Sequence, residues 1–529
     1  MQQKITLKVL PSEAADDKAL GRLVAAACGV TAAKITGYSI LKRSIDARSR
    51  QVWVNLTLKV FIDEPFQPTE LLPLHLQDVH GASRQVIVIG AGPAGLFAAL
   101  RLIEHGIRPV VLERGKDVRA RRRDLAAMNK EGIVNPESNY CFGEGGAGTY
   151  SDGKLYTRST KRGDVQRILS VLVHFGADER ILYEAHPHIG TNKLPHIITA
   201  MRDQIRACGG QVLFDSKVVD LVLENGAATG VKTAAGDTLS GAAVILATGH
   251  SARDIFHLLH EKQIGIELKP YALGVRIEHP QALIDSIQYH TPDRGDFLPP
   301  ASYSLVQQVE GQGVFSFCMC PGGIIAPAAT NAGEIVVNGW SPSKRNNPFA
   351  NSGIVVTANP EELHASGELK KYLRQHGLPA TGPLLGLYFQ QMVEQKAFTA
   401  GGGKLVAPAQ RMADFVQNKP SPTLPDCSYL PGIAPADLRQ VLPAFIHRAL
   451  QGAFREFGKK MKGYLTNEAV VVATESRTSS PVRIPRDPDT LQHPQVKNLY
   501  PCGEGAGYAG GIVSAAMDGE RLANFIAER

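Results

Sequence analysis

The stretch from Val86 to Leu100, VIVIGAGPAGLFAAL, decides the fold of this chain. It opens with an uninterrupted apolar run, which is typical of a strand buried on both faces of a parallel sheet. Gly90, Gly92 and Gly95 follow in the spacing G-x-G-x-x-G, just before a sequence that favours a helix. The first glycine permits a tight turn, the second lets the backbone approach a pyrophosphate, and the third lets the helix pack on the strand. The stretch therefore predicts a helix whose N-terminal amides face phosphates.

A second predicted strand completes this unit. Residues 108–115, RPVVLERG, form another apolar run, and Glu113 stands at its end. A carboxylate at this place can accept hydrogen bonds from a ribose diol and would repel a 2′-phosphate. The same glycine spacing occurs at residues 143–148 and 505–510, but neither opens a strand–helix–strand unit that ends in an acid. Only the match at Gly90 therefore predicts a dinucleotide site.

The composition limits what else the chain can be. It has 529 residues, 43% hydrophobic and 20% charged, which indicates a globular protein of three to four domain-sized units. Its 52 glycines show no collagen period, and its net charge of +7 is too mild to indicate nucleic-acid binding. The seven cysteines form no CxxC pair or zinc pattern, so we expect reduced thiols, no metal site and a cytoplasmic location. No run of about 18 apolar residues predicts a membrane span.

Three units are expected along the chain. Residues 1–80 predict a small βαββ domain that ends in a proline-bearing linker. Residues 85–260 and 465–529 predict one Rossmann-like domain, split in sequence, in which a three-stranded meander precedes the apolar run AAVILATG. Residues 265–465 predict an inserted mixed α+β domain. The expected fold class is therefore α/β, with a mixed α+β insertion and the small βαββ domain.

Three motifs together carry a family resemblance. They are the glycine turn at Gly90, the sequence Ala247-Thr248-Gly249 after the meander, and NLYPCGEGAGYAGG at residues 498–511. This trio resembles the large group of flavoproteins related to glutathione reductase and hydroxybenzoate hydroxylase. No second βαβ unit with this glycine spacing appears at residues 240–280, and no CxxC pair lies near the first helix, so a disulfide reductase is disfavoured.

The resemblance implies FAD as the cofactor. In the related flavoproteins the third motif normally ends in Gly-Asp, and here Gly503-Glu504 stands in its place, which leaves a carboxylate role open. By the same resemblance Gly511 and Ile512 should face the pyrimidine edge of the flavin, where a helix N-terminus stabilises negative charge. The expected FAD-binding residues are Gly90, Ala91, Gly92, Pro93, Ala94, Gly95, Glu113, Arg114, Gly146, Val218, Ala247, Thr248, Gly249, Gly503, Glu504, Gly510, Gly511 and Ile512.

Most of the chain looks like a bacterial family of FAD-dependent dehydrogenases with an N-terminal βαββ unit. The resemblance implies an oxidoreductase that uses bound flavin for hydride or electron transfer. It supplies no substrate, so we expect a small molecule, with NADH or NADPH as a candidate transient electron donor. Two alternatives remain open: a flavoprotein that modifies RNA through its N-terminal unit, and a protein that binds FAD without turnover. Oligomeric state and the catalytic acid or base are not predicted.

Several weaker features have two interpretations each. Arg119 and Arg121–Arg123 suggest either an anionic site or, as we prefer, a solvated helix face. The loop Gly143–Lys154 is expected to lie along the flavin rather than to be an ordinary surface loop. Cys318 and Cys320 would share one face of a strand, and we prefer buried packing to redox chemistry. His250 is expected near the flavin because it follows the Ala247–Gly249 motif directly.

Overall fold

The computed structural model describes residues 1–157 and 163–529, and a parallel sheet forms its centre. The apolar run before Gly90 forms strand β4, which pairs with β5 on one side and β10 on the other. The chain first builds β5 and β6 on one side of β4 and later adds β10 and β22 on the other side. In sheet order the strands are β22 (Leu499–Pro501), β10 (Ala243–Leu246), β4 (Gln85–Ile89), β5 (Arg108–Leu112) and β6 (Gln211–Leu213).

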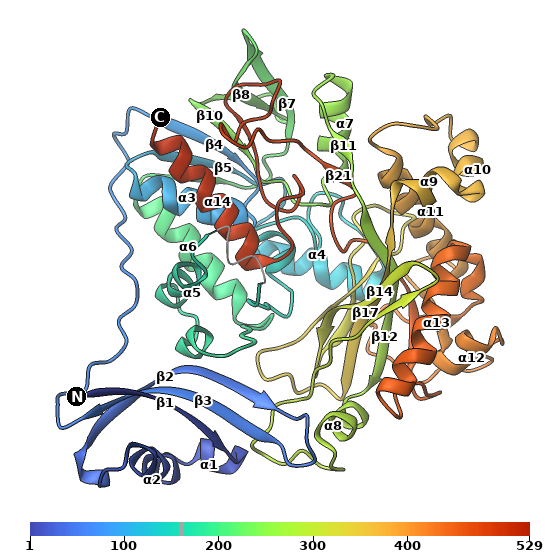
Figure 1. Ribbon diagram of the computed structural model, residues 1–529. Helices are drawn as coiled ribbons and strands as arrows, with labels where there is room; N and C mark the ends of the chain where they lie inside the picture. Colours follow the sequence, from blue (N-terminus) through green and yellow to red (C-terminus); the bar gives the residue numbers. More distant parts are fainter. Residues whose placement is uncertain (158–162) are drawn as a thin grey trace.

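Both faces of this sheet are buried, as the apolar sequence of β4 predicts. Ile87 and Ile89 point toward the three-stranded meander, whereas Val86 and Val88 pack with the helices on the opposite face. The meander consists of β7 (Val218–Glu224), β8 (Ala227–Thr233) and β9 (Thr238–Ser240). The helices that pack on the other face are α3 (Pro93–Glu104), α5 (Val165–His174), α6 (Leu194–Ala207) and α14 (Ile512–Ala527). Helix α14 lies beside α3, so the two ends of the expected split domain meet (Figure 1).

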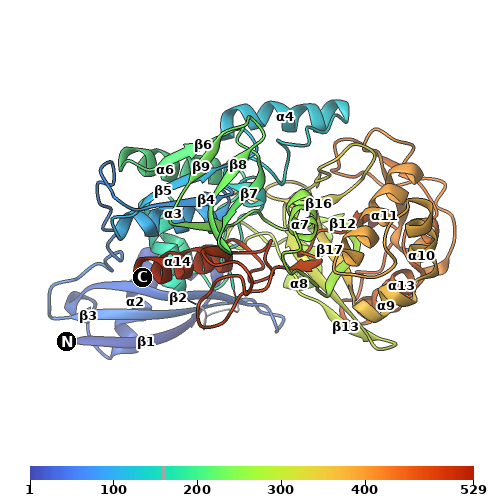
Figure 2. The same cartoon turned by 90° about the horizontal axis from the view of Figure 1, so that it is seen from above.

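A seven-stranded sheet forms the second large part of the molecule, with helices on its outer side (Figure 2). Its order is β13 (Val306–Val309), β14 (Gln312–Cys320), β17 (Phe349–Ala358), β12 (Tyr271–Pro280), β20 (Val470–Glu475), β18 (Ala407–Arg411) and β19 (Ile433–Pro435). Strand β20 lies beyond residue 465, so this sheet continues into residues that we assigned to the parallel-sheet domain. The outer helices are α9 (Pro360–Ala365), α10 (Gly367–Gln375), α11 (Leu385–Ala400), α12 (Met412–Gln417) and α13 (Ala444–Lys460).

Shorter elements connect the two parts. Helix α4 (Val118–Glu131) follows β5, and α7 (Arg253–Glu261) follows β10. Helix α8 (Gln281–Tyr289) follows β12. A hairpin formed by β15 (Ile324–Pro327) and β16 (Val337–Trp340) packs beside the seven-stranded sheet. Strand β11 (Glu267–Leu268) pairs with β21 (Val482–Arg483). The two parts meet where residues 247–249 after β10, Phe317 and Cys318 of β14, and Asn338 and Gly339 of β16 line one cavity.

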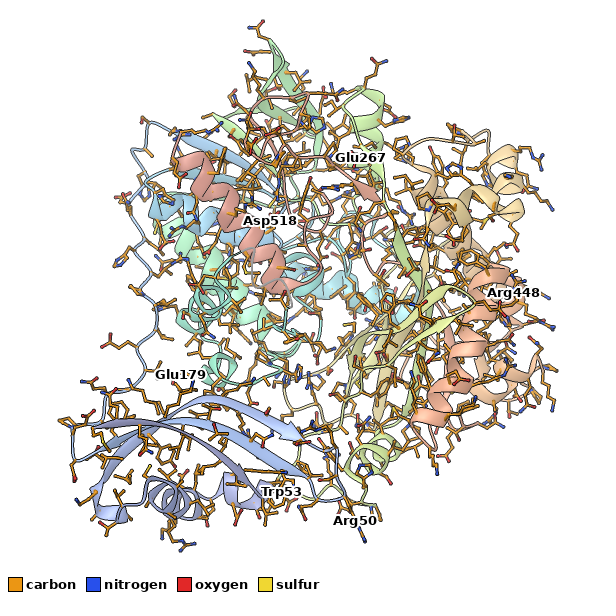
Figure 3. All side chains as sticks on the ribbon, viewed as in Figure 1. Arg50, Trp53, Glu179, Glu267, Arg448 and Asp518 are labelled. Atoms are coloured by element: carbon orange, nitrogen blue, oxygen red, sulfur yellow. The ribbon has the colours of Figure 1, made fainter. Side chains whose placement is uncertain are left out.

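The N-terminal residues fold as the predicted βαββ unit. Strands β1 (Gln2–Val9), β2 (Ile35–Asp46) and β3 (Trp53–Ile62) form a sheet in the order β1-β3-β2, with α1 (Pro11–Ala15) and α2 (Asp17–Cys28) on one face. Arg50 in the hairpin turn and Trp53 at the start of β3 mark the end of this sheet near α8 (Figure 3). The edge strand β2 docks on the rest of the chain, because Arg43 exchanges backbone hydrogen bonds with Tyr183 and Ala185 at 2.8 and 2.9 Å.

Candidate functional site

A cavity of about 370 Å³ opens at the carboxyl ends of β4, β5, β10 and β22. The strand order reverses between β4 and β10, and ligands of doubly wound sheets bind in the crevice at such a point. The cavity extends from Glu113 and Val218 at one end to Phe317 and Cys318 of the seven-stranded sheet. Its size is within the range of small-molecule and cofactor sites, about 300–1,000 Å³.

Nearly all the residues expected at the FAD site line this cavity. Two of them, Ala91 and Gly95, are absent from the lining and have structural roles instead. A Cβ on Gly95 would lie 1.9 Å from the Gly90 carbonyl oxygen, so this glycine allows α3 to pack against β4. The others do line it: Gly90, Gly92, Pro93, Ala94, Glu113, Arg114, Gly146, Val218, Ala247, Thr248, Gly249, Gly503, Glu504, Gly510, Gly511 and Ile512.

Two glycine loops face each other at the N-terminus of α3. A Cβ on Gly92 would have the Gly146 Cα as its nearest neighbour, at 4.0 Å, and Gly146 has a left-handed φ of +61°. Side chains at either position would occupy the space between the loops. This space, lined by backbone and set at a helix N-terminus, suits a pyrophosphate. The loop Gly143–Lys154 thus contributes to the cavity wall, with Gly146, Ala147, Gly148, Ser151, Asp152, Gly153 and Lys154 in the lining.

Glu113 holds three backbone segments together at the end of β5. Its carboxylate accepts hydrogen bonds from the amides of Ala91, Gly115 and Gly143 at 3.0, 2.9 and 2.9 Å. The side chain is buried yet lines the cavity, and two carboxylate oxygens offer about four acceptor positions. Glu113 can therefore still accept from a ribose hydroxyl while it fixes the glycine turn to the Gly143 loop.

Other atoms along the cavity also fit FAD. The Thr248 hydroxyl is buried, lines the cavity and has no hydrogen-bond partner, so a bound ligand could satisfy it. Asp518 of α14 (Figure 3) accepts a hydrogen bond from the Gly503 amide at 2.8 Å and thereby fixes the turn that carries Glu504. Helix α14 begins with Ile512 at the cavity wall. The glycine loops, the Thr248 hydroxyl and two helix N-termini together provide donors along the length of a dinucleotide.

His250 lines the cavity, as its position after the Ala247–Gly249 motif predicts. Its Nε2 lies 3.7 Å from a Glu504 carboxylate oxygen, and its Nδ1 lies 3.1 Å from the Ser251 hydroxyl. Burial lowers the pKa of His250, although the Glu504 carboxylate acts in the opposite direction. The imidazole is therefore neutral at neutral pH, with one ring nitrogen able to accept a proton or hydrogen bond.

A charged cluster lies at the cavity wall where the Gly143–Lys154 loop meets residues that follow β16. The buried Asp152 carboxylate pairs with Arg345 at 2.7 Å and Lys154 at 3.4 Å, and it accepts a hydrogen bond from Ser341 at 2.5 Å. Lys154 retains 35% of its side-chain exposure and lines the cavity. This lysine, which the sequence analysis did not single out, places a cation where negative charge could develop on a ligand.

The two thiols of the CxC sequence lie beside this lysine. The Lys154 Nζ is 3.7 Å from the sulfur of Cys318 and 3.7 Å from that of Cys320. Cys318 lines the cavity, whereas Cys320 is fully buried behind it. Simple strand alternation does not account for this arrangement, because the pairing of β14 with β17 shifts register between Phe317 and Cys320. Cys318 is therefore not enclosed in the apolar core as packing alone would require, because it lies at the cavity wall beside a charged group. Its redox role stays a hypothesis.

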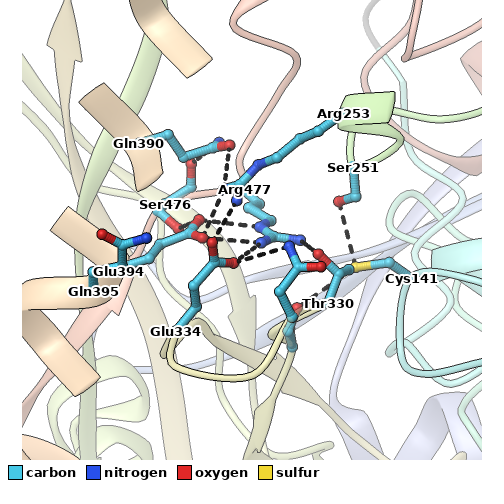
Figure 4. Close-up of polar contacts among 12 residues, drawn as sticks. Cys141, Ser251, Arg253, Thr330, Glu334, Gln390, Glu394, Gln395, Ser476 and Arg477 are labelled. Atoms are coloured by element: carbon cyan, nitrogen blue, oxygen red, sulfur yellow. Dashed lines mark hydrogen bonds and ion pairs between the residues drawn. The ribbon is translucent and has the colours of Figure 1, made fainter. Parts of the chain in front are cut away.

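A buried charged network supports the same wall (Figure 4). Arg477, which lines the cavity, binds Glu394 at 2.9 Å and Thr330 at 2.7 Å, and Arg253 binds Glu334 at 2.8 Å and Glu394 at 2.7 Å. Although burial acts in the opposite direction, the two arginines lower the pKa of Glu394 to about 2. The network fixes Arg477 and α7 to α11 and to the turn between β15 and β16, a long-range arrangement for which the sequence offers no local signal.

The arginine-rich stretch after β5 contains one internal residue. Arg121 is fully buried and donates to the carbonyl oxygens of Asn139, Tyr140, Glu144 and Gly146 at 2.8–3.0 Å. The prediction of a solvated helix face is therefore wrong for Arg121, although Arg119, Arg122 and Arg123 are exposed. One helix turns a single arginine inward because side chains on adjacent positions point in different directions. This arginine fixes the glycine loop that reaches the cavity.

Residues 1–157 and 163–529 contain no group of three or more His, Cys, Asp or Glu side chains that could hold a metal ion. No helix within the same ranges is both long and apolar enough to cross a membrane.

Comparison with family models gives three matches. Residues 83–127 match an FAD binding domain, and residues 270–478 match the C-terminal domain of FAD-dependent proteins. Residues 1–61 match a domain of unknown function. The match to the C-terminal domain of FAD-dependent proteins spans the strands of the seven-stranded sheet, including β20. The match to the domain of unknown function spans the N-terminal sheet.

Two protein sequences are similar to this chain. An uncharacterised protein of Clostridium beijerinckii is 38% identical over 515 residues, which cover 94% of this chain and 93% of that protein. The thiamine thiazole synthase of Aeropyrum pernix is 30% identical over 147 residues, or 28% of this chain and 42% of the enzyme.

Solved structures match this chain at low sequence identity and low TM-score. A Photorhabdus luminescens protein described as an FAD-containing monooxygenase is 12% identical, with a TM-score of 0.36, and the match covers 84% of this chain and 89% of that one. CtdE in complex with FAD is 10% identical, with a TM-score of 0.31, and the match covers 83% and 84% of the two chains. Together with the full-length sequence relative and the FAD family models, the cavity geometry leads to one conclusion: this chain belongs to a bacterial family of FAD-dependent proteins, and its cofactor is FAD.

Proposed function

We propose that the protein is a dehydrogenase or reductase that moves electrons between bound FAD and a small-molecule substrate. The observation that carries the proposal is the single cavity that joins Glu113, at the adenosine end, to Lys154 and Cys318 of the opposite wall. When bound, the flavin would supply the hydride or electron chemistry. A substrate would then enter beside Lys154, where the seven-stranded sheet completes the wall.

The chain's own residues have distinct roles in this proposal. Gly92 and Gly146 would hold the pyrophosphate through their backbones, and Glu113 would orient the ribose. Lys154 and the N-terminus of α14 would stabilise negative charge in the reduced state. The neutral His250, 3.7 Å from Glu504, is placed to accept or return a proton at its Nε2.

The N-terminal sheet supports a docking role rather than an RNA contact. Its edge strand binds residues 183–185 through backbone hydrogen bonds, and the Arg43 guanidinium pairs with Glu184 at 2.9 Å. Part of the basic surface that could face a phosphate backbone is therefore occupied within the chain. RNA that copurifies with the protein, or RNA affinity that falls steeply with salt, would favour the RNA-modifying alternative instead.

The proposal is tested by purifying the full chain and recording its visible spectrum before and after adding FAD. We expect the protein to contain bound flavin. Under anaerobic conditions, NADH, NADPH or a small-molecule donor should reduce this flavin. The cofactor assignment would be overturned if the purified protein contained no flavin and also failed to bind added FAD. A flavin that binds but that no physiological donor reduces would instead indicate a protein that binds FAD without turnover.

A further inference from the structure

Two cysteine sulfurs and one ammonium group meet at the wall of the FAD cavity. Lys154 belongs to the glycine loop, whereas Cys318 and Cys320 belong to β14, yet the Lys154 Nζ lies 3.7 Å from both sulfurs. Because both sulfurs contact one nitrogen, the thiols occupy the same small volume. The Cys320 thiol also donates a hydrogen bond to the Cys318 carbonyl oxygen at 3.2 Å.

The backbone of β14 is shaped to bring these thiols together. Cys318 has a left-handed φ of +46°, and the register with β17 shifts between Phe317 and Cys320. The buried Arg276 guanidinium donates to the Cys318 carbonyl oxygen at 3.4 Å while it pairs with Glu475 at 2.7 Å. A non-glycine residue in this conformation is uncommon and persists where its surroundings hold it.

The charges around the pair make the two thiols unequal. The neighbouring Cys320 thiol lowers the pKa of Cys318 most, and the Lys154 and Arg276 cations add to this effect against burial and Asp152. The neighbouring Cys318 and burial raise the pKa of Cys320. Within the pair, Cys318 at the cavity wall is therefore the more acidic thiol, and Cys320 behind it is the less acidic one. This is the arrangement of an attacking and a resolving thiol.

We propose that Cys318 and Cys320 form a redox-active pair that exchanges two electrons with FAD in the adjoining cavity. In this step an S–S bond forms between the Cys318 thiolate and Cys320, and the Cys320 S–H bond breaks. The two electrons and the Cys320 proton would pass to FAD held in the cavity, which would supply the two-electron acceptor. One negative charge would thus leave the Cys318 sulfur with the electrons, and the reverse step would reduce the disulfide. Lys154 lies beside the sulfur that carries this charge before the step.

The inference rests on the proposed function, because FAD is the partner in the exchange. We would oxidise the FAD-bound protein, remove oxygen and titrate it with dithionite while recording the flavin spectrum. The oxidised wild type should take up about four electrons per FAD, because a flavin and a disulfide are each two-electron couples. Cys318→Ser and Cys320→Ser should each take up about two. Cys28→Ser, which alters a distant N-terminal thiol, and Cys141→Ser, which alters another cavity thiol, should retain about four.

Alkylation followed by mass spectrometry supplies a readout that needs no flavin. When the protein is denatured in the presence of maleimide, the reagent should label Cys318 and Cys320 in the reduced protein but not in protein oxidised with diamide before denaturation, whether FAD was bound or not. Uptake of about two electrons by the FAD-bound wild type, with both thiols still labelled after oxidation, would overturn the pair. The pair would also be overturned if Cys141→Ser took up only about two electrons per FAD while Cys318→Ser and Cys320→Ser took up about four. If the protein bound no FAD but still formed the Cys318–Cys320 disulfide, the proposed function and FAD as the electron partner would be overturned, but the cysteine pair would not. This outcome distinguishes failure of the proposed function from failure of the pair.

Discussion

The Glu113 carboxylate accepts a hydrogen bond from the Gly143 amide at 2.9 Å, and this contact ties the end of β5 to the glycine loop over the cavity. The same carboxylate binds the amides of Ala91 and Gly115. Glu113 was expected to serve a ribose, and the structure adds the role of a structural junction. A variant at this position should therefore affect both folding and FAD binding.

Glu113→Ala should lower the free energy of unfolding of the FAD-free protein by about 2–4 kcal/mol, because three buried amides lose their acceptor. It should also weaken FAD binding, since the ribose contact and the loop position are both lost. Denaturant unfolding and quenching of flavin fluorescence measure the two effects. Unchanged stability would contradict the junction role, and unchanged affinity would contradict the ribose assignment.

Gly92 and Gly95 should respond differently to the same substitution. A Cβ on Gly92 meets no atom closer than 4.0 Å and the residue has a φ of −77°, so Gly92→Ala should fold normally. Its methyl group would occupy the expected pyrophosphate space, and we expect FAD affinity to fall about tenfold or more, about 1.4 kcal/mol. Titration of the FAD-free variant with FAD measures this loss.

Gly95→Ala is the matched comparison for Gly92→Ala. Its Cβ would lie 1.9 Å from the Gly90 carbonyl oxygen, so the variant should lose about 1–3 kcal/mol of stability even without FAD. The thermal unfolding midpoint of the FAD-free protein measures the difference. If Gly92→Ala is the less stable variant, or binds FAD normally, the division of roles between the two glycines is wrong.

Arg121 should be far more sensitive to substitution than its exposed neighbour Arg122. Arg121→Met removes the donors of four backbone carbonyl groups inside the protein and should cost about 2–4 kcal/mol. Arg122→Met on the same helix should change stability by no more than about 0.5 kcal/mol. Denaturant unfolding compares the two, and equal effects would show that the buried guanidinium does not hold the glycine loop.

Glu278 should make stability depend on pH. Burial raises its pKa from 4.5 to about 7, although its hydrogen bonds with Ser428 act in the opposite direction. Because the folded protein binds this proton more tightly, the stabilising effect is complete below about pH 4.5 and is lost as the pH rises through about 7. Over this window the group accounts for up to about 3 kcal/mol.

Glu278→Gln should therefore flatten the decline in stability between pH 4.5 and 7. Denaturant unfolding at several pH values measures the slope, and Glu261→Gln, at an exposed position on α7, serves as the control. The same slope in wild type and Glu278→Gln would show that this carboxyl group is ionised in the folded protein throughout the window.

Much of the fold was predictable because its signals are local. The apolar run of β4 must be covered on both faces, and its residues indeed alternate between the meander and the helices. The expected division into three domains stays a prediction, and β20 shows why the boundary near residue 465 was difficult. A buried strand has the same apolar sequence whichever sheet it joins, so only its pairing partners decide its place.

The sequence by itself determined the glycine turn, because Gly90, Gly92 and Gly95 act through conformations and close approaches that belong to a few consecutive residues. Only the tertiary structure decided that Lys154 meets Cys318, 164 residues away, or that Arg121 alone of its cluster turns inward. The physical reason is that pKa values and burial depend on the groups that surround a side chain in space. Backbone shape is encoded locally, whereas the chemistry of the cavity wall arises where two sheets meet.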